Sequence, residues 1–491
     1  MNPKIEWMEW GRAAFDKSIK EEKPILLSIN TSWCRFCGQM EKETYLCEEV
    51  INRVGRGFVP VRVNSDERPD INLRYNQGGW PSTVFLTSRG RVITGCTYAS
   101  RPEFFDLLEQ VGGIYKSLQR SGQNLGESEN LEPPVSFEEK RLYFIKYHAS
   151  YVLRFEELLV AGFDPIYGGF GTDGPKFPLP EVLELCLRRI KATGDAKLRL
   201  ILERTLEGMS EGGLWDFLDG GFFRCCLDRG WQSPRFEKLL EDNVNLARVY
   251  FEAGQILGDK RFTEISERTI RFINQWLYQR ETGAFFNSVS ADADYYIFAS
   301  RAERLNYLDE HQSPKVDTTV YTNGAALASD LYFELRGKEA PQAALNLLLT
   351  SFRCPSGLFF HYKSGEAGKF SDFLADQLSL VRCLLNPVLN SSVGASDLKP
   401  RVLAEDLWKS TFDNFYDSTE GGFLDRRKSD DDLGLLKIPR KVLKDNVEAV
   451  RLLKHFGQVE AARKTLIELL WQNKTPNLNS GPLATLLLEN V

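Results

Sequence analysis

The sequence has no long apolar run and no concentration of basic residues. No stretch approaches the roughly 20 apolar residues of a membrane span, and the first ten residues carry acidic and aromatic side chains where a signal peptide needs an apolar segment. The net charge of −6 is spread along the chain without the basic stripe of a nucleic-acid-binding protein. We therefore expect a cytosolic protein that binds neither membranes nor nucleic acid.

The cysteines lack the regular spacing of a disulfide framework. Nine cysteines are scattered through 491 residues, and most are expected to fill the core. These core cysteines are Cys186, Cys225, Cys226, Cys354 and Cys383. No second pair and no histidine cluster accompanies Cys34 and Cys37, which disfavours a zinc site, so no metal is predicted. Phosphate-loop, dinucleotide and Ser-His-Asp signatures are also missing, and no cofactor is predicted.

The pair Cys34-x-x-Cys37 follows an apolar run, residues 24–29, that predicts a strand, and precedes a helical pattern over residues 38–50. A cysteine at a helix N-terminus faces unpaired amides and the positive end of the helix dipole, which stabilise the thiolate. We expect Cys34 to be the nucleophile and Cys37, one turn inside, to be the more buried resolving thiol. Two inert buried thiols are the alternative.

Pro81 follows Trp80 directly before a predicted strand. An X-Pro bond adopts the cis form at a cost of only about 0.5–1 kcal/mol, and we predict a cis bond here that exposes the backbone of Trp80 to a docking peptide or thiol. A trans proline at the start of a strand is the alternative.

Sequence patterns divide the chain into two domains and a linker. Residues 1–120 alternate strands and helices, residues 121–136 are polar and end in a proline pair, and residues 137–491 show long amphipathic helical patterns. The strands are predicted at Ile25–Ile29, Phe58–Asn64, Ser82–Leu86 and Val92–Thr97. The prediction is an α/β domain, a linker and a nearly all-helical domain.

A glycine–aromatic phrase recurs in the helical part. It occurs as Gly168-Gly169-Phe170, Gly220-Gly221-Phe222, Gly283-Ala284-Phe285, Gly357-Leu358-Phe359 and Gly421-Gly422-Phe423. The intervals are roughly one helical hairpin long, which indicates about six hairpins. A closed ring, an (α/α)6 toroid, would bring these loops together at one end around a cavity. Ordinary helix C-caps with a hydrophobic contact are the alternative.

Charged and aromatic residues gather near the second and third phrases. They are Asp216, Arg224, Trp231, Arg235, Glu237, Lys238, Asp242, Asn243, Asp292 and Asp294, and a further group, Arg440, Lys441, Asp445 and Asn446, precedes the last hairpin. Such side chains can bind sugar hydroxyls and a ring face, and two acids can cleave a glycosidic bond. Equally, they can cap helices and pair with one another. The spacing of Glu237 and Glu241 predicts a shared helix face.

Several longer motifs together resemble one known family. They are Asp66 to Asp70, Gly79 to Thr87, Gly168 to Gly171 with Pro175 to Pro178, Asp219 to Arg224, and Pro234 to Asn243. In this order they are similar to the thioredoxin-like family of the spermatogenesis-associated protein 20 type. The resemblance covers almost the whole chain. It implies an α/β thioredoxin-like domain followed by an all-α (α/α)6 toroid of the kind found in sugar 2-epimerases and six-hairpin glycosidases.

Three positions depart from the family pattern. Gly38 follows the second cysteine and Arg235 follows Pro234, where family members usually have histidine, and Ser28 replaces the buried aspartate of thioredoxins. Arginine stays protonated, so Arg235 can bind an anionic or hydroxyl-rich ligand but cannot act as a base. Beside it, Asp242 is expected to have a lowered pKa.

The sugar 2-epimerases that the toroid resembles use a pair of histidines as general acid and base. This chain has too few histidines near the phrases for that mechanism. The chain has His148, His311, His361 and His455, and only His361 adjoins a glycine–aromatic phrase. The leading hypothesis is a thiol–disulfide redox protein that acts on a protein thiol or disulfide and whose toroid binds a sugar-like ligand or a partner. The alternatives are a carbohydrate-active enzyme using Glu237, Asp242, Asp292 or Asp294, and a binding module without turnover.

Overall fold

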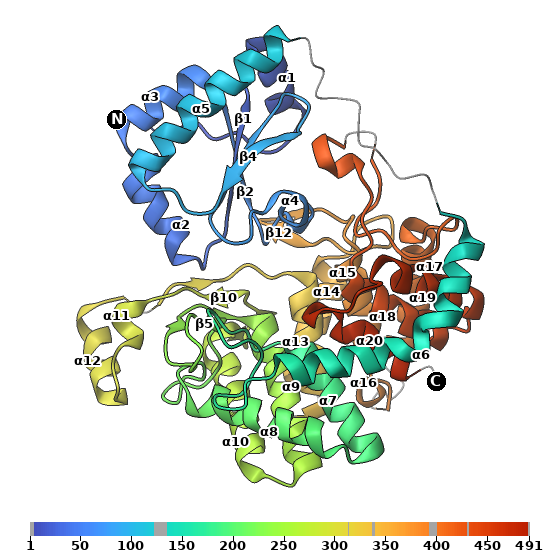
Figure 1. Ribbon diagram of the computed structural model, residues 1–491. Coiled ribbons are helices and arrows are strands. Elements are labelled where there is room, and N and C mark those ends of the chain that lie inside the picture. The colour runs from blue at the N-terminus through green and yellow to red at the C-terminus, as the bar shows by residue number, and fades with distance from the viewer. Residues whose placement is uncertain are drawn as a thin grey trace. The chain divides into compact units, whose positions relative to one another are not determined.

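A computed structural model describes residues 4–121, 135–312, 314–335, 339–391, 400–429 and 432–489. It forms two compact units, here called the N-terminal unit (Met1–Pro134 with Lys428–Pro439) and the helical unit (Val135–Arg427 with Arg440–Val491), both drawn in Figure 1. The predicted linker lies outside the described residues except for positions 121, 135 and 136. No helix of the described chain is long and apolar enough to span a membrane.

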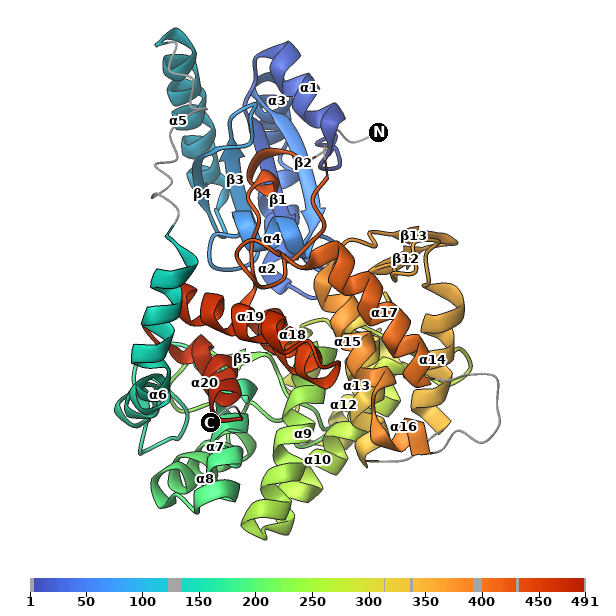
Figure 2. The ribbon, with the colours of Figure 1, turned by 90° about the vertical axis from the view of Figure 1, so that its right-hand side faces the viewer.

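The N-terminal unit is built on a four-stranded sheet of order β2-β1-β3-β4. Its strands are β1 (Ile25–Asn30), β2 (Val59–Asn64), β3 (Ser82–Leu86) and β4 (Val92–Cys96). Strand β1 runs parallel to β2 and antiparallel to β3, and β3 runs antiparallel to β4. The predicted strands are confirmed, and the sheet has the mixed topology of a thioredoxin-like domain (Figure 2).

Helices cover both faces of this sheet. They are α1 (Arg12–Glu21), α2 (Arg35–Met40) with a π-helical turn (Glu41–Tyr45), α3 (Glu48–Gly57), α4 (Pro69–Tyr75) and α5 (Arg101–Arg120). Successive side chains of a strand point to opposite faces, so Leu27 and Ile29 of β1 pack with α1 and α4, whereas Leu26 packs with α3 and α5. The central strand is therefore apolar on both faces, and it ends just before the two cysteines.

A segment from late in the chain completes the core on the α1 and α4 side. It contains a 3-10 turn (Gly434–Lys437), and its Leu436 is buried against β1 and α4. The Arg74 side chain of α4 donates hydrogen bonds to the carbonyl oxygens of Leu435 and Ile438, both at 3.0 Å. The N-terminal unit is thus discontinuous in sequence, and part of its core comes from residues that follow most of the helical unit.

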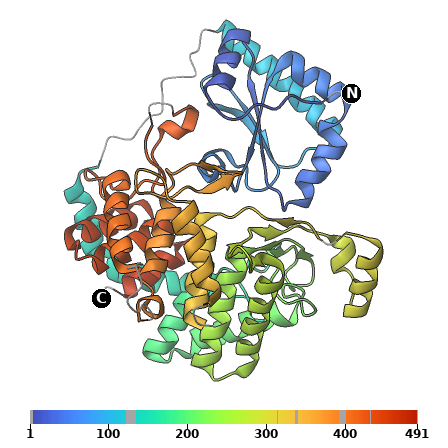
Figure 3. The same ribbon diagram turned by 180° about the vertical axis from the view of Figure 1, so that it is seen from behind.

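The helical unit is a closed ring of six hairpins (Figures 1 and 3). Its inner helices are α7 (Pro180–Thr193), α9 (Leu240–Leu257), α13 (Thr322–Leu335), α15 (Leu374–Leu384), α18 (Leu443–His455) and α20 (Gly481–Leu488). Each inner helix contacts the next, and α20 contacts α7 and closes the ring. The predicted (α/α)6 toroid is confirmed.

Each inner helix packs on an outer one. In the same order, the outer helices are α8 (Ala196–Glu211), α10 (Lys260–Phe272) with a π-helical turn (Ile273–Leu277), α14 (Glu339–Ser351), α17 (Pro400–Phe415), α19 (Val459–Gln472) and α6 (Phe137–Gly162). The first helix of the unit, α6, therefore pairs with the last, α20 (Figure 2). This pairing means that residues from both ends of the unit are needed for the sixth hairpin.

The loops carry the remaining short elements. These are α11 (Ala293–Tyr296), α12 (Arg301–Glu310), α16 (Pro387–Ser391), a 3-10 turn (Leu478–Ser480), β5 (Cys225–Cys226), β6 (Pro234–Arg235), β7 (Lys238–Leu239), β8 (Tyr278–Gln279), β9 (Ala284–Phe285), β10 (Ser288–Val289), β11 (Val316–Asp317), β12 (Tyr362–Ser364) and β13 (Ala367–Lys369). All five glycine–aromatic phrases lie in loops that lead from an outer helix to the next inner helix. They therefore share the end of the ring at which the inner helices begin.

Candidate functional site

Each unit contains one candidate site. In the N-terminal unit, Cys34 is the N-cap residue of α2, and the backbone N–H of Cys37 donates a hydrogen bond to its Sγ at 3.2 Å. All nine cysteines are free thiols. Cys34 is 8% exposed and Cys37 is 7% exposed. Cys37, which was expected to be the more buried thiol, is almost equally buried, because Cys34 is the N-cap of α2 and Cys37 lies in its first turn.

The chain before β3 lies against the sulfur of Cys34. The Trp80–Pro81 peptide bond is cis, as predicted, and the carbonyl oxygen of Trp80 is 3.5 Å from Cys34 Sγ. The Trp80 ring meets the Trp33 ring edge-on, with centroids 5.3 Å apart. The backbone of residue 80 and the first turn of α2 therefore enclose the sulfur from two sides.

Asp66 holds the loop that leads into Cys34. Its carboxylate accepts hydrogen bonds from Trp33 Nε1 and Thr31 Oγ1, both at 3.0 Å. Because Asp66 directly follows β2 and its partners directly follow β1, it ties the ends of two neighbouring strands together. Sequence reasoning singled this residue out only through the family resemblance, since a charged turn after a strand is otherwise unremarkable.

In the helical unit, several predicted ligand residues hold the glycine–aromatic loops. The Asp216 carboxylate accepts from the N–H of Leu218 at 3.1 Å and from Lys238 Nζ at 2.8 Å, and the same ammonium donates to the Gly220 carbonyl oxygen at 2.7 Å. Burial opposes ionisation of Asp216, but Lys238 and Arg304 outweigh it and lower its pKa. In the first phrase, Lys176 likewise pairs with Asp164 and donates to the Gly168 carbonyl oxygen. In the fifth phrase, Lys441 forms an equivalent ion pair with Asp417.

Asn243 holds the aromatic residue of the second phrase. Its side chain accepts from the Phe222 N–H at 2.6 Å and donates to the Phe222 carbonyl oxygen at 3.1 Å. Asn446 makes the same two bonds to Phe423, and Gln377 makes them to Phe359. The polar groups of Asp216, Lys238 and Asn243 are therefore hydrogen-bonded within the protein. All three residues are buried, and the most exposed of them, Asp216, is 3% exposed.

Other predicted residues occupy loop and core positions. Trp231 is fully buried against Gly169 and donates its Nε1 to the Tyr167 carbonyl oxygen at 3.0 Å, so it offers no ring face to a sugar. Asp292 caps α11, and Asp294 is exposed on the same short helix.

Arg224, Arg235 and Glu237 lie on the strand-like loop before α9. The Arg224 N–H bonds the Glu237 carbonyl oxygen at 2.9 Å, and Arg235 pairs with Cys225 in the β5–β6 ladder. Because α9 begins only at Leu240, Glu237 and Glu241 do not share a helix face, and that prediction is wrong.

Asp242 does not have the lowered pKa expected from sequence. Burial raises its pKa to about 7, and the charge of neighbouring Glu241 adds to the effect. The positive charge of Arg224 acts in the opposite direction but is outweighed. The expectation is wrong because the free-energy cost of removing the carboxylate from water exceeds the attraction to the arginine.

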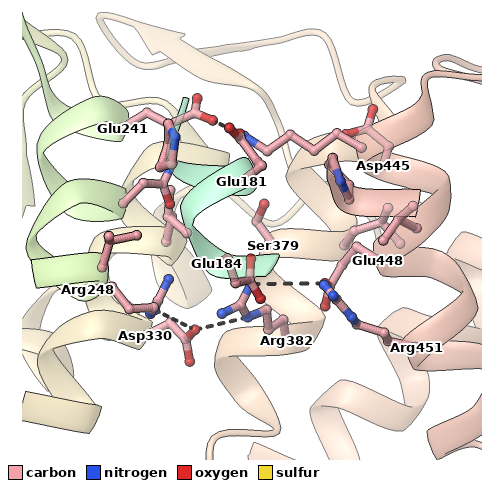
Figure 4. A pocket seen from close by; sticks show the side chains of 18 of the residues that line it. Glu181, Glu184, Glu241, Arg248, Asp330, Ser379, Arg382, Asp445, Glu448 and Arg451 are labelled. Carbon is pink, nitrogen blue, oxygen red and sulfur yellow. Dashed lines mark hydrogen bonds and ion pairs between the residues drawn. The ribbon is translucent and has the colours of Figure 1, made fainter. Parts of the chain in front are cut away.

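The helical unit encloses a cavity of about 480 Å³ between its inner helices (Figure 4). It is lined by Pro180, Glu181, Glu184, Leu187, Arg188, Glu241, Asn245, Arg248, Val249, Glu252, Asn323, Leu327, Asp330, Ala375, Leu378, Ser379, Arg382, Lys444, Asp445, Val447, Glu448, Arg451 and Pro482. None of the ten ligand residues proposed near the second and third phrases is among these described lining residues. Two other residues named in the sequence analysis, Glu241 and Asp445, do line the cavity.

The first layer of the cavity lies at the start of the inner helices. Lys444 of α18 forms an ion pair with Glu241 of α9 and a second, at 3.4 Å, with Glu181 of α7. Burial raises the pKa of neighbouring Asp445 to about 7, and the charge of Glu241 contributes although Lys444 opposes it. A carboxyl group with a pKa near neutrality can donate or accept a proton at physiological pH.

A second layer forms the floor of the cavity. It consists of the residue eight positions after the start of five inner helices, Arg188, Arg248, Asp330, Arg382 and Arg451, together with Glu489, the residue directly after α20. Asp330 pairs with Arg248 at 3.2 Å and with Arg382 at 3.1 Å, and Glu489 pairs with Arg451 at 3.1 Å and Arg188 at 2.9 Å. Sequence reasoning missed this layer. The available signal was a charged residue eight positions after the start of every inner helix.

One histidine lies near the first layer. The Nδ1 atom of His361 is 2.9 Å from the Asp376 carboxylate, which also accepts the Asn323 N–H at 3.0 Å. No histidine is among the described residues that line the cavity. No group of three or more His, Cys, Asp or Glu side chains in the described chain could hold a metal ion.

Comparison with solved structures relates the helical unit to sugar-converting enzymes. A D-mannose isomerase superposes with a TM-score of 0.52 and 10% identity, covering 70% of this chain and 98% of the isomerase. The cellobiose 2-epimerase of Bacillus thermoamylovorans superposes with a TM-score of 0.51 and 11% identity, covering 68% of this chain and 86% of the epimerase. At such low identity these likenesses show a shared toroid fold alone.

Comparison at the sequence level supports the family resemblance. Residues 1–130 match the family described as "Thioredox_DsbH: Protein of unknown function, DUF255". Spermatogenesis-associated protein 20 of Rattus norvegicus and of Homo sapiens are each 32% identical over 315 residues, which is 60% of this chain. The chain spans only 39% of the length of these relatives. It thus has an N-terminal thioredoxin-like domain whose sequence matches the DsbH-like family model, followed by a six-hairpin toroid, and over 315 residues it is similar to spermatogenesis-associated protein 20.

Proposed function

We propose that this protein carries out thiol–disulfide exchange through Cys34 and Cys37. The observation that carries the proposal is the hydrogen bond from the Cys37 N–H to Cys34 Sγ at the start of α2. An amide donor and the helix N-terminus both favour the thiolate of Cys34 over its thiol, and the thiolate is the attacking form. Cys37 lies within the same helical turn and can reach the sulfur of Cys34 by side-chain rotation.

The exchange has two balanced steps. The Cys34 thiolate attacks one sulfur of a substrate disulfide, the substrate S–S bond breaks, and the second substrate sulfur leaves as a thiolate. Cys37 then loses its proton and attacks Cys34, which releases the first substrate sulfur and leaves a Cys34–Cys37 disulfide. The carbonyl of Trp80 beside Cys34 Sγ supports this proposal, because an extended substrate segment can hydrogen-bond the backbone of residue 80 with its sulfur next to Cys34.

A trapping experiment tests this function. The Cys37→Ser variant is incubated with a peptide disulfide and should accumulate a mixed disulfide at Cys34, detectable by intact mass, since the resolving thiol is missing. Cys34→Ser should form none, and Cys47→Ser, which changes a half-exposed cysteine outside the pair, should behave like the parent protein. Equal trapping by Cys34→Ser and Cys37→Ser would remove the proposed function.

A second candidate function belongs to the toroid, for which we infer binding of a sugar-like small molecule in the central cavity. The cavity volume of about 480 Å³ lies within the range of small-molecule sites. The sugar-converting enzymes with the same fold support this choice of ligand class. Calorimetric titration with a panel of monosaccharides and disaccharides tests it, and heat signals no larger than those of an Asp445→Leu variant would reject it.

A further inference from the structure

The cations of the cavity are all engaged by carboxylates. Arg188 pairs with Glu184 at 2.7 Å, Arg248 and Arg382 share Asp330, Lys444 pairs with Glu241, and Arg451 pairs with Glu448 at 3.3 Å. An anionic ligand would therefore have to displace a carboxylate from its arginine or lysine before it could bind. Such an exchange gains little, because one ion pair replaces another.

The carboxylates of the cavity outnumber its cations. Seven acidic and five basic side chains line it, so the lining carries a formal charge of −2 when all groups are ionised. The first layer holds three acids, Glu181, Glu241 and Asp445, which are labelled in Figure 4, and one lysine, Lys444, which pairs with Glu181 and Glu241. Among the described residues, no ion pair engages Asp445. Positive charge on a ligand would thus meet an uncompensated carboxyl group at this end of the cavity.

Neutral polar side chains lie level with the first layer, at Asn323, and between the two charged layers, at Asn245 and Ser379. Asn245, Asn323 and Ser379 line the cavity, and within the described chain their side chains make no hydrogen bond to the protein. Their amide and hydroxyl groups are donors and acceptors that suit ligand hydroxyls. The cavity therefore offers hydroxyl-binding groups next to a region that favours a cation.

We propose that the ligand of the toroid cavity is an amino sugar, whose ammonium group binds at Asp445 and Glu241 and whose hydroxyls bind Asn245, Asn323 and Ser379. This proposal rests on the second candidate function, a sugar-like ligand in the cavity, and adds the charge of that ligand. The proposal excludes acidic sugars as the preferred class. It also predicts a preference for a sugar with a free amine over the N-acetylated sugar, which has the same ring but no positive charge.

Proton release on binding is a further consequence. The groups that influence Asp445 are Lys444 on its own helix, Glu241 of α9, Asp376 of α15 and Asp425 of the preceding loop, and the net effect with burial is a pKa of about 7. At pH 7 the carboxyl group is therefore about half protonated. An ammonium placed beside it stabilises the carboxylate, so that part of the protein population loses a proton when the ligand binds.

The test is isothermal titration calorimetry of the full chain at pH 7 with D-glucosamine, D-glucose, N-acetyl-D-glucosamine and D-glucuronate. Each titration is repeated in phosphate and in HEPES buffer, because a difference in apparent enthalpy between buffers measures proton release. We expect glucosamine to bind about tenfold or more tightly than the other three sugars, as one charge-assisted hydrogen bond would give, with proton release for glucosamine alone.

Two variants complete the experiment. Asp445→Asn should lose the preference for glucosamine and the proton release, whereas Glu460→Gln, which changes an exposed carboxylate in the first turn of outer helix α19, should retain both. Equal or tighter binding of glucose, N-acetylglucosamine or glucuronate overturns the amino-sugar proposal and leaves the sugar-binding function standing. Failure of all four sugars to bind overturns both. Retention of the glucosamine preference in Asp445→Asn also overturns the proposal.

Discussion

The backbone N–H of Cys37 points at the sulfur of Cys34 across 3.2 Å, so the second cysteine of the pair supplies a hydrogen bond that favours the thiolate form of the first. This arrangement depends on the helix beginning directly after Cys34. It gives the two thiols different chemistry although their exposures are nearly equal.

We expect alkylation by iodoacetamide at pH 6.5 to modify Cys34 at least about tenfold faster than Cys47, since only Cys34 receives a backbone N–H at a helix start. Peptide mass spectrometry of the reduced protein after short labelling times measures both rates in one sample. Because each cysteine is the N-cap of a helix, comparable rates would show that the hydrogen bond from the Cys37 N–H does not activate Cys34.

The Leu436→Ala substitution should destabilise the N-terminal unit by about 2–4 kcal/mol, because it leaves a cavity in the core formed by β1 and α4. Hydrogen exchange resolved by peptide should show faster exchange in β1, more than 400 residues earlier in the chain. Leu305→Ala, at an exposed position of α12, is the matched control. Unchanged exchange in β1 would mean that the late segment contributes nothing to that core.

The Asp216→Asn substitution should cost about 3–5 kcal/mol of unfolding free energy, because it leaves the fully buried ammonium of Lys238 without its carboxylate. The equivalent change Asp417→Asn should cost much less, since the Asp417 side chain is 25% exposed and Lys441 keeps Glu468 at 3.7 Å. Urea unfolding of both variants under identical conditions measures the difference. Equal losses would contradict a buried ion pair as the cause.

Asp445 should make the protein less stable as the pH rises. Its pKa is about 7 in the folded protein against 3.8 in the unfolded chain, so the folded state binds more protons between these values and the free energy of unfolding falls across this window. Relative to the parent protein, Asp445→Asn should gain about 3 kcal/mol between pH 4 and pH 7, at about 1.4 kcal/mol per pKa unit. Urea unfolding of both proteins over this range is the measurement, and a constant difference would refute the raised pKa.

Local sequence was sufficient to predict both folds, but not that residues 428–439 belong to the N-terminal unit. The strand before Cys34, the helix after it and the cis bond at Pro81 all depend on residues close together in the chain, and each was predicted. The repeated glycine–aromatic phrases likewise predicted the hairpins, since each phrase marks a loop between an outer and an inner helix. Such features are visible in sequence because the interactions that form them are short-range.

Only the tertiary structure decided which side chains surround the cavity and which hold the loops. Asp216, Lys238 and Asn243 had the chemistry of a ligand site, but they bond the loop backbone instead. The actual lining, from Pro180 to Pro482, converges from six helices spread over about 300 residues, in a ring that the contact of α20 with α7 closes. The direction of the pKa shift predicted for Asp242 was likewise wrong, because the burial that raises this pKa arises only in the closed ring. Sequence specifies each helix through local periodicity, whereas the face of a helix that meets the cavity is set by contacts between distant hairpins.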